Sequence, residues 1–200
     1  MINFENIKVA FADKSDKDLS RAYLLFKTIS NPIISNTLTA FIKVAMWLHL
    51  PINWAIKATV YKHFCGGTTI ENSQATIDKL WESHIGTILD FSAEGKENEE
   101  DFNLAMNETI ASIQKAKSES SIPFSVFKPT GLARFALLEK ISNNSNLTKE
   151  EEIEKTIFEG RIENICQTAS DNKVPLFIDA EESWIQDAID DIAIKMMQKF

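Results

Sequence analysis

Cysteine is scarce in this 200-residue chain, in which Cys65 and Cys166 are the only two. Neither residue belongs to a Cys-x-x-Cys pair, and no cluster of histidines and cysteines surrounds either one. A disulfide-stapled scaffold or a structural zinc site is therefore not expected. Free thiols suit a reducing compartment.

Positive charge is also in short supply. The chain has 29 acidic against 21 basic side chains, which gives a formal net charge of −8, and it contains no basic cluster. A surface this acidic repels phosphate backbones, so a nucleic-acid partner is not expected.

Long uninterrupted apolar runs are absent as well. The most apolar stretch, residues 33–60, is broken by Pro51 and by several polar residues, whereas a membrane-spanning helix needs about 20 mostly apolar residues. The N-terminus has no basic start followed by an apolar run, so it does not resemble a signal peptide. We favour helices packed on a domain core for residues 33–60, with an amphipathic pair at a membrane surface as the alternative.

Common catalytic motifs are missing too. The sequence has no P-loop, no Gly-rich dinucleotide fingerprint after a strand, and no nucleophile-elbow or zinc-protease motif. Its three histidines, His49, His63 and His84, are scattered over expected helices or helix ends. We interpret all three as structural residues.

What the sequence does contain is a repeated strand–helix pattern after the pair Gly66-Gly67. Before this pair, apolar residues recur at helical spacings, which predicts a helical arm over residues 1–67. After it, three short apolar runs are each followed by a helical pattern, which predicts strands at 87–91, 124–128 and 174–179. This alternation is typical of an α/β fold with parallel strands and right-handed crossovers.

A charged residue stands at the end of each expected strand: Asp90, Lys128 and Asp179. The chemistry of parallel α/β proteins sits at the C-terminal ends of the strands. We therefore expect the three side chains to converge at one edge of the sheet, although each could also merely terminate its strand.

The length of the strand–helix region limits the architecture. A (β/α)8 barrel needs roughly 250 residues, and three parallel strands cannot close because their edges stay exposed. Residues 68–200 are therefore predicted to be the first three βα units of an incomplete (β/α)8 (TIM-like) barrel, the start of a larger domain.

Four short motifs follow one another along the chain: FCGGTT at 64–69, GTILDFSAEG at 86–95, FKPTGL at 127–132 and IDAEE at 178–182. In this order, and at the ends of expected strands, they resemble the proline dehydrogenase family. The resemblance runs from about Tyr61 to the C-terminus, and the residues before it match only in general character. It implies a distorted (β/α)8 barrel with non-covalent FAD that oxidises L-proline to Δ1-pyrroline-5-carboxylate and passes the electrons to a membrane quinone.

The resemblance also assigns roles to individual residues. Lys128 would bind the carboxylate of proline, and Asp179 would be the active-site acid that orders a substrate-clamping arginine beside the flavin. Ala180 would offer its backbone to FAD, Asp90 would support the polar cluster, and Glu181 would be an outer partner. A buried ammonium without a partner costs several kcal/mol, so a carboxylate beside Lys128 is expected. The family would place the protein in the cytoplasm or peripherally at the inner face of a membrane, and in the mitochondrion of a eukaryote.

The sequence departs from the family pattern in two respects. Pro129, directly after Lys128, is unusual and is expected to change the loop while it leaves the strand end intact. The family's late pair of arginines, a nearby tyrosine and most flavin contacts have no counterpart, because Arg21, Arg134 and Arg161 stand elsewhere. We therefore expect the chain to be an incomplete piece of the enzyme.

Two other functions stay open. Lys128 at a strand end could form a Schiff base, as in class I aldolases, and borohydride trapping against a flavin spectrum would separate these two enzymes. The chain could also be a non-catalytic helical interaction module with half a barrel attached, for which a protein partner without FAD would be the evidence.

Overall fold

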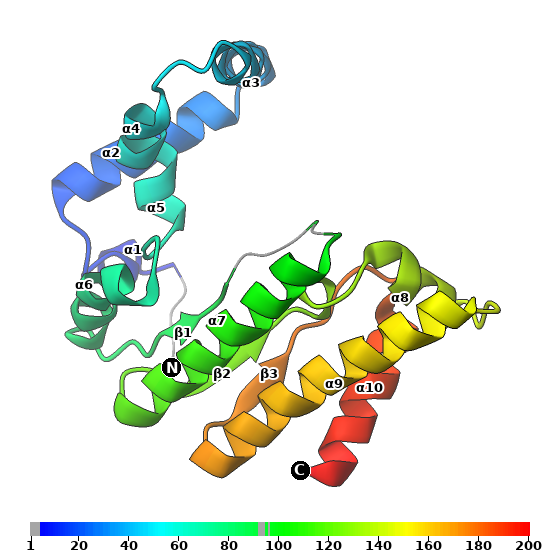
Figure 1. Cartoon of the computed structure of the whole chain (residues 1–200). Coiled ribbons are helices and arrows are strands. Elements are labelled where there is room, and N and C mark those ends of the chain that lie inside the picture. The colour runs from blue at the N-terminus through cyan, green and yellow to red at the C-terminus, as the bar shows by residue number, and fades with distance from the viewer. Residues whose placement is uncertain (1–4, 92–94, 96) are drawn as a thin grey trace. The chain divides into compact units, whose positions relative to one another are not determined.

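The computed structural model describes residues 5–91, 95 and 97–200 of the chain (Figure 1). By their contacts the residues group into two units, Met1–Ser73 and Gln74–Phe200. Each unit is built around its own elements and is described by itself.

The N-terminal unit is helical. Its elements are α1 (Ile7–Ala10), α2 (Asp16–Ile29), α3 (Pro32–Trp47), α4 (Asn53–Ile56), a π-helical turn (Lys57–Tyr61), α5 (Lys62–Phe64) and the first turn of α6 (Ile70–Trp81). The side chains of Ser15 and Asn31 accept backbone hydrogen bonds at the starts of α2 and α3, which satisfies amide groups that a helix start leaves unpaired. The helical pattern expected before Gly66 is thereby confirmed.

The helices of this unit bury little. Among its described residues only Ala45 and Ser73 are buried, whereas Ile33 and Trp47 are 79% and 76% exposed. Over the described ranges, no helix combines the length and the apolarity that crossing a bilayer requires.

Gly67 lies against the start of α6. A Cβ atom built on Gly67 would be 2.5 Å from Ser73 Oγ and 2.6 Å from Ser73 N, closer than side chains come to such atoms. The glycine is thus required by close packing of the backbone. A threonine before a helix can cap its N-terminus. Thr69 does so here, because its hydroxyl accepts a hydrogen bond from Asn72 N at 3.1 Å.

The C-terminal unit holds a sheet of three strands, β1 (Ile88–Leu89), β2 (Phe124–Phe127) and β3 (Leu176–Ile178). The strands are parallel and lie in the order β1-β2-β3, as the strand–helix pattern predicts. Each strand is shorter than expected from the sequence. β3 begins only after Pro175, because proline has no N–H to donate to a ladder.

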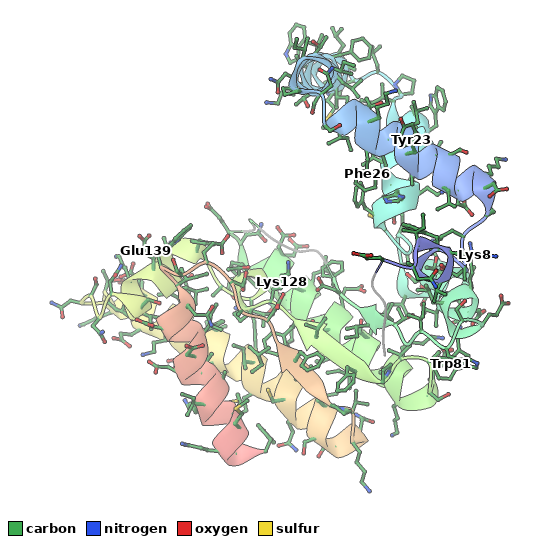
Figure 2. All side chains as sticks on the ribbon, turned by 180° about the vertical axis from the view of Figure 1, so that it is seen from behind. Lys8, Tyr23, Phe26, Trp81, Lys128 and Glu139 are labelled. Carbon is green, nitrogen blue, oxygen red and sulfur yellow. The ribbon has the colours of Figure 1, made fainter. Side chains whose placement is uncertain are left out.

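Long helices connect the strands. α7 (Glu99–Ser118) joins β1 to β2, while a 3-10 turn η2 (Pro129–Gly131), α8 (Phe135–Ser142) and α9 (Lys149–Asn172) join β2 to β3, and α10 (Gln186–Lys199) follows β3. The two views agree that α7 and α9 lie on one side of the sheet (Figures 1 and 2). The Thr-x-x-Glu pattern of Thr148 and Glu151 predicts a capping box from the sequence, and this box is present at the start of α9.

Some helix boundaries differ from the expectation. α9 continues through Asn172, where the sequence predicts a turn, and ends at Lys173 in the left-handed conformation with φ 56°. The last helix begins at Gln186, so Trp184 and Ile185 precede it. Local signals place helix ends only approximately, because packing decides how far the last turn persists.

The core lies between the sheet and its helices. Phe127 of β2 is buried there, and Leu89 of β1 and Leu176 and Ile178 of β3 pack against the same cluster. Residues of alternate parity face the other way: Ile88 is 43% and Phe177 is 46% exposed. Alternation along a strand sends successive side chains to opposite faces, so the sheet has one helix-covered face and one open face.

Candidate functional site

Lys128 and Asp179 lie side by side at the C-terminal edge of the sheet. Asp179 N donates to Phe127 O at 3.1 Å, so the ladder between β2 and β3 continues to this residue. Lys128 is still extended, with φ −104° and ψ 124°. Both follow their strands by one position, and alternation gives them the parity of Val126 and Phe177. They therefore belong to the open face, at the edge where Figure 2 labels Lys128.

Asp90 follows β1 at the same edge and is exposed. Asp90 and Lys128 both line a small cavity of about 10 Å³, the space of roughly one water molecule. The structure thus brings Asp90 close to Lys128, and Lys128 next to Asp179. The later part of the motif at 86–95, Ser92 to Glu94, lies outside the described residues.

Glu181 joins the loops that follow β2 and β3. Its carboxylate accepts a hydrogen bond from Thr130 N at 2.9 Å and a second, very short one from the Thr130 hydroxyl. Thr130 is only 4% exposed, and Glu181 is half-buried. The family resemblance implies an outer role for Glu181 and assigns no role to Thr130.

The environment of Glu181 shifts its protonation. Burial raises the pKa of the Glu181 carboxyl above its ordinary value, although the hydrogen bonds from Thr130 and the charge of Lys128 oppose that rise. Lys128 is therefore close enough to act on Glu181 electrostatically.

Ala180 lies between Asp179 and Glu181 and is exposed. The next residue is anchored, because Glu181 N donates to Gln186 Oε1 at 2.8 Å and Gln186 in turn donates to Asp190 at 2.7 Å. A methyl side chain on a fixed, exposed segment allows a flat ring to approach the backbone closely.

All three arginines are engaged in ion pairs with Asp or Glu side chains. Arg134 binds Glu154 through two hydrogen bonds of 2.8 and 2.6 Å. Arg21 lies 3.4 Å from Asp18 on the same helix. The two arginines of the C-terminal unit, Arg134 and Arg161, are therefore each paired with a glutamate and not with Asp179.

The third arginine, Arg161, is buried in the interior of the C-terminal unit. It donates to Asn103 Oδ1 and to Leu132 O, both at 3.0 Å, and it pairs with Glu99. Leu132 lines the small cavity beside Lys128. Arg161 thus ties α7, α9 and the loop after β2 together, a connection that no local sequence signal announces.

Two further reactive side chains, Cys166 and His63, lie in packed surroundings. Burial raises the pKa of the Cys166 thiol to about 11, which keeps it protonated and inert. His63 packs edge-on against the rings of Phe26 and Phe64, with centroid distances of 5.1 and 4.9 Å. In the part of the chain that the structure describes, no three His, Cys, Asp or Glu residues come together to hold a metal ion.

Several known proteins are similar to this chain in sequence. The family profile "Proline dehydrogenase" matches residues 73–200. The carbapenem antibiotics biosynthesis protein CarD of Pectobacterium carotovorum subsp. carotovorum is 31% identical over 137 residues, covering 68% of this chain and 36% of that protein. Mitochondrial proline dehydrogenase 1 of Dictyostelium discoideum is 26% identical over 229 residues, covering 95% of this chain and 40% of its own length.

A third relative, mitochondrial proline dehydrogenase 1 of Arabidopsis thaliana, is 28% identical over 176 residues, covering 69% of this chain and 35% of that protein. The chain thus spans between 35% and 40% of the length of these three relatives. The family profile covers most of the chain and includes all three strands with the residues at their C-terminal ends. The chain belongs to the proline dehydrogenase family.

Proposed function

We propose that this chain supplies the first three βα units of a distorted (β/α)8 barrel that binds FAD and oxidises L-proline to Δ1-pyrroline-5-carboxylate. The observation that carries the proposal is the position of Lys128 and Asp179. They follow neighbouring parallel strands, at one edge and with the parity of one face. Membership of the proline dehydrogenase family supports this choice of substrate.

Lys128 binds the carboxylate of proline in this proposal. An ammonium group suits a carboxylate as a point charge, and a site away from bulk water strengthens the attraction. Asp90 in the same cavity and Glu181 nearby balance the charge of Lys128 before the substrate arrives. The carboxylate of proline then binds the ammonium group of Lys128.

Asp179 organises the opposite side of the substrate. Oxidation of proline removes a hydride equivalent from a ring carbon and a proton from the ring nitrogen, and FAD held at this edge would supply the two-electron oxidant for the hydride equivalent. Asp179 carries a charge that would hold an arginine from the rest of the barrel in place to bind the carboxylate bidentately. Fixed geometry of this kind supplies much of the rate enhancement in such reactions.

Ala180 would contact the flavin through its backbone, as the geometry of this edge allows. We further propose that a quinone takes the electrons and that the protein works in the cytoplasm or at the inner face of a membrane, in the mitochondrion of a eukaryote. The exposed apolar helices of the N-terminal unit support a peripheral contact with a membrane surface.

The central test is Lys128→Met in the flavin-loaded protein that contains this chain. We expect KM for L-proline to rise roughly 10- to 100-fold, because a charged contact to the carboxylate is worth about 1.5–3 kcal/mol. Lys149→Met, an exposed residue in the first turn of α9, serves as the matched control and should leave the kinetics unchanged. Wild-type KM in Lys128→Met would remove Lys128 from the substrate site.

Asp179→Ala tests the second group. We expect turnover to fall roughly a hundredfold, because removing one preorganised charged partner costs on the order of 3 kcal/mol. The 200-residue chain by itself should neither retain FAD nor oxidise proline, because its arginines are all paired elsewhere. Proline-dependent dye reduction by this chain alone would refute the proposed division of the site.

The two alternatives are less well supported. A Schiff base needs a neutral lysine, whereas the carboxylates of Asp90 and Glu181 near Lys128 suit an ammonium group that binds an anion. Borohydride trapping of a carbonyl substrate on Lys128 would favour the aldolase reaction. A protein partner bound without FAD would favour an interaction module.

A further inference from the structure

The backbone hydrogen-bond ladder between β2 and β3 ends next to Lys128 and Asp179 of the candidate site. Ser125 N donates to Pro175 O at 3.0 Å, and Asp179 N donates to Phe127 O at 3.1 Å. Donors on one strand of a parallel ladder recur at every second residue. After Ser125 and Phe127, the next donor on this strand would be residue 129. That residue is Pro129, which has no N–H.

Thr130 and Glu181 take over where the backbone ladder ends. The register pairs Phe127 with Ile178, so counting forward pairs Lys128 with Asp179 and Thr130 with Glu181. The Glu181 carboxylate binds both the amide and the hydroxyl of Thr130. These two hydrogen bonds, here called the Thr130–Glu181 clamp, hold the two chains together two residues beyond Lys128 and Asp179.

The clamp is well built for this task. Thr130 is 4% exposed, so water competes poorly for its hydrogen bonds. Lys128 is fixed from its other side as well, because Lys128 O accepts a hydrogen bond from Gly131 N at 3.0 Å. Gln186 of α10 accepts from Glu181 N at 2.8 Å and so anchors the clamp to a helix.

We propose that Thr130 is a positioning residue, and that its clamp with Glu181 sets the spacing of Lys128 and Asp179, so that Lys128 and the arginine that Asp179 would hold reach one carboxylate ligand. Because Pro129 has no N–H, the backbone ladder does not continue through this residue. Without the clamp, each charged side chain would move with its own loop. The inference deepens the proposed function and rests on it for the identity of the ligand.

Thr130→Val and Thr130→Ser form the matched pair for a test. Valine keeps the shape and the backbone N–H but removes the hydroxyl donor, whereas serine keeps the hydroxyl. Glu181→Ala removes both acceptors. Thermal unfolding first shows whether each variant folds. If Glu181→Ala does not fold, the isosteric Thr130→Val variant still tests the inference.

The first readout is independent of activity. Brief acetylation of the 200-residue chain with acetic anhydride, followed by mass spectrometry, reports the accessibility of each lysine. We expect Lys128 to label at least about threefold faster in Thr130→Val and Glu181→Ala, but not in Thr130→Ser, because loosening the clamp exposes a half-buried side chain. Lys149 should label at the same rate throughout. Unchanged labelling of Lys128 in folded Thr130→Val and Glu181→Ala would overturn the inference.

The second readout is the kinetics of the flavin-loaded protein. Thr130→Val should raise KM for L-proline roughly tenfold with kcat within about twofold, because the loss falls on placement of the carboxylate-binding charge. Thr130→Ser should restore the wild-type KM. Faster labelling of Lys128 with wild-type KM would overturn the link to substrate binding. If the wild-type protein oxidises no proline while the labelling pattern holds, the clamp stands and the proposed function fails.

Discussion

Gly67 and Gly160 occupy opposite environments, although both residues lack a side chain. A Cβ on Gly67 would collide with the backbone at the start of α6, whereas a Cβ on Gly160 of α9 would meet no atom within 4 Å. The same substitution at the two positions therefore separates close packing from backbone entropy.

Gly67→Ala should destabilise the chain by about 1–3 kcal/mol, because the start of α6 has to shift to make room. Gly160→Ala should stabilise it by roughly 0.5–1 kcal/mol, because alanine is the better residue inside an exposed helix. Urea unfolding followed by circular dichroism measures both changes. A neutral Gly67→Ala would contradict the close approach to Ser73.

Arg161 is a buried, charged residue of α9 that binds α7 and the loop after β2. Arg161→Met should cost about 2 kcal/mol, because the carbonyl of Leu132 loses its hydrogen bond inside the protein. Arg134→Met is the control, since its pair with Glu154 is partly exposed. That control should cost less than about 1 kcal/mol. Equal losses in the two variants would argue against a special role for Arg161.

At the scale of elements, helix ends and loops carry carboxylates whose protonation follows their surroundings. The hydrogen bond from Lys140 lowers the pKa of Glu151, with a further contribution from the Thr148 amide. Burial raises the pKa of Glu181. The two residues should therefore respond to pH in opposite directions.

Glu151 in its folded environment stabilises the chain above the ordinary glutamate pKa of 4.5, and this contribution is lost as the pH falls through the lowered pKa. For Glu181, the folded protein holds the proton more tightly than the unfolded chain does. Stability therefore falls as the pH rises from 4.5 through the raised pKa.

Thermal unfolding of Glu151→Gln and Glu181→Gln across this pH range tests both signs. The Tm of Glu151→Gln relative to wild type should fall as the pH rises towards 4.5. The relative Tm of Glu181→Gln should rise as the pH increases above 4.5. Parallel pH curves for a variant and the wild type would show that its residue has the same pKa folded and unfolded.

At the scale of the whole molecule, the open face of the sheet in the C-terminal unit exposes apolar side chains. Phe124 and Phe177 stack there with ring centroids 4.8 Å apart, and Phe177 is 46% exposed. β1 and β3 each have only one neighbour among the described residues. Exposed apolar faces and free strand edges both favour association.

The isolated chain should therefore self-associate as its concentration rises. Phe177→Ser should weaken this association roughly tenfold, because burying a phenylalanine contributes about 1.5–3 kcal/mol. Lys149→Ser at the start of α9, a polar exposed residue, is the control and should change little. Light scattering coupled to size-exclusion chromatography measures the mass. A monomer at every concentration would contradict this prediction.

The sequence by itself determined the order and the type of the elements. Alternating apolar runs predicted three parallel strands, and the pair Thr148 and Glu151 predicted where α9 begins, because these signals depend on spacings of a few residues. The same reasoning predicted that Lys128 and Asp179 stand at strand ends, since parallel strands bring their C-terminal ends to one edge.

Only the tertiary structure decided which distant residues hold that edge together. Thr130 and Glu181 are 51 residues apart, and Arg161 reaches back 62 residues to Glu99. Local sequence signals report spacings along the chain, whereas these contacts exist only after the helices have packed against the sheet.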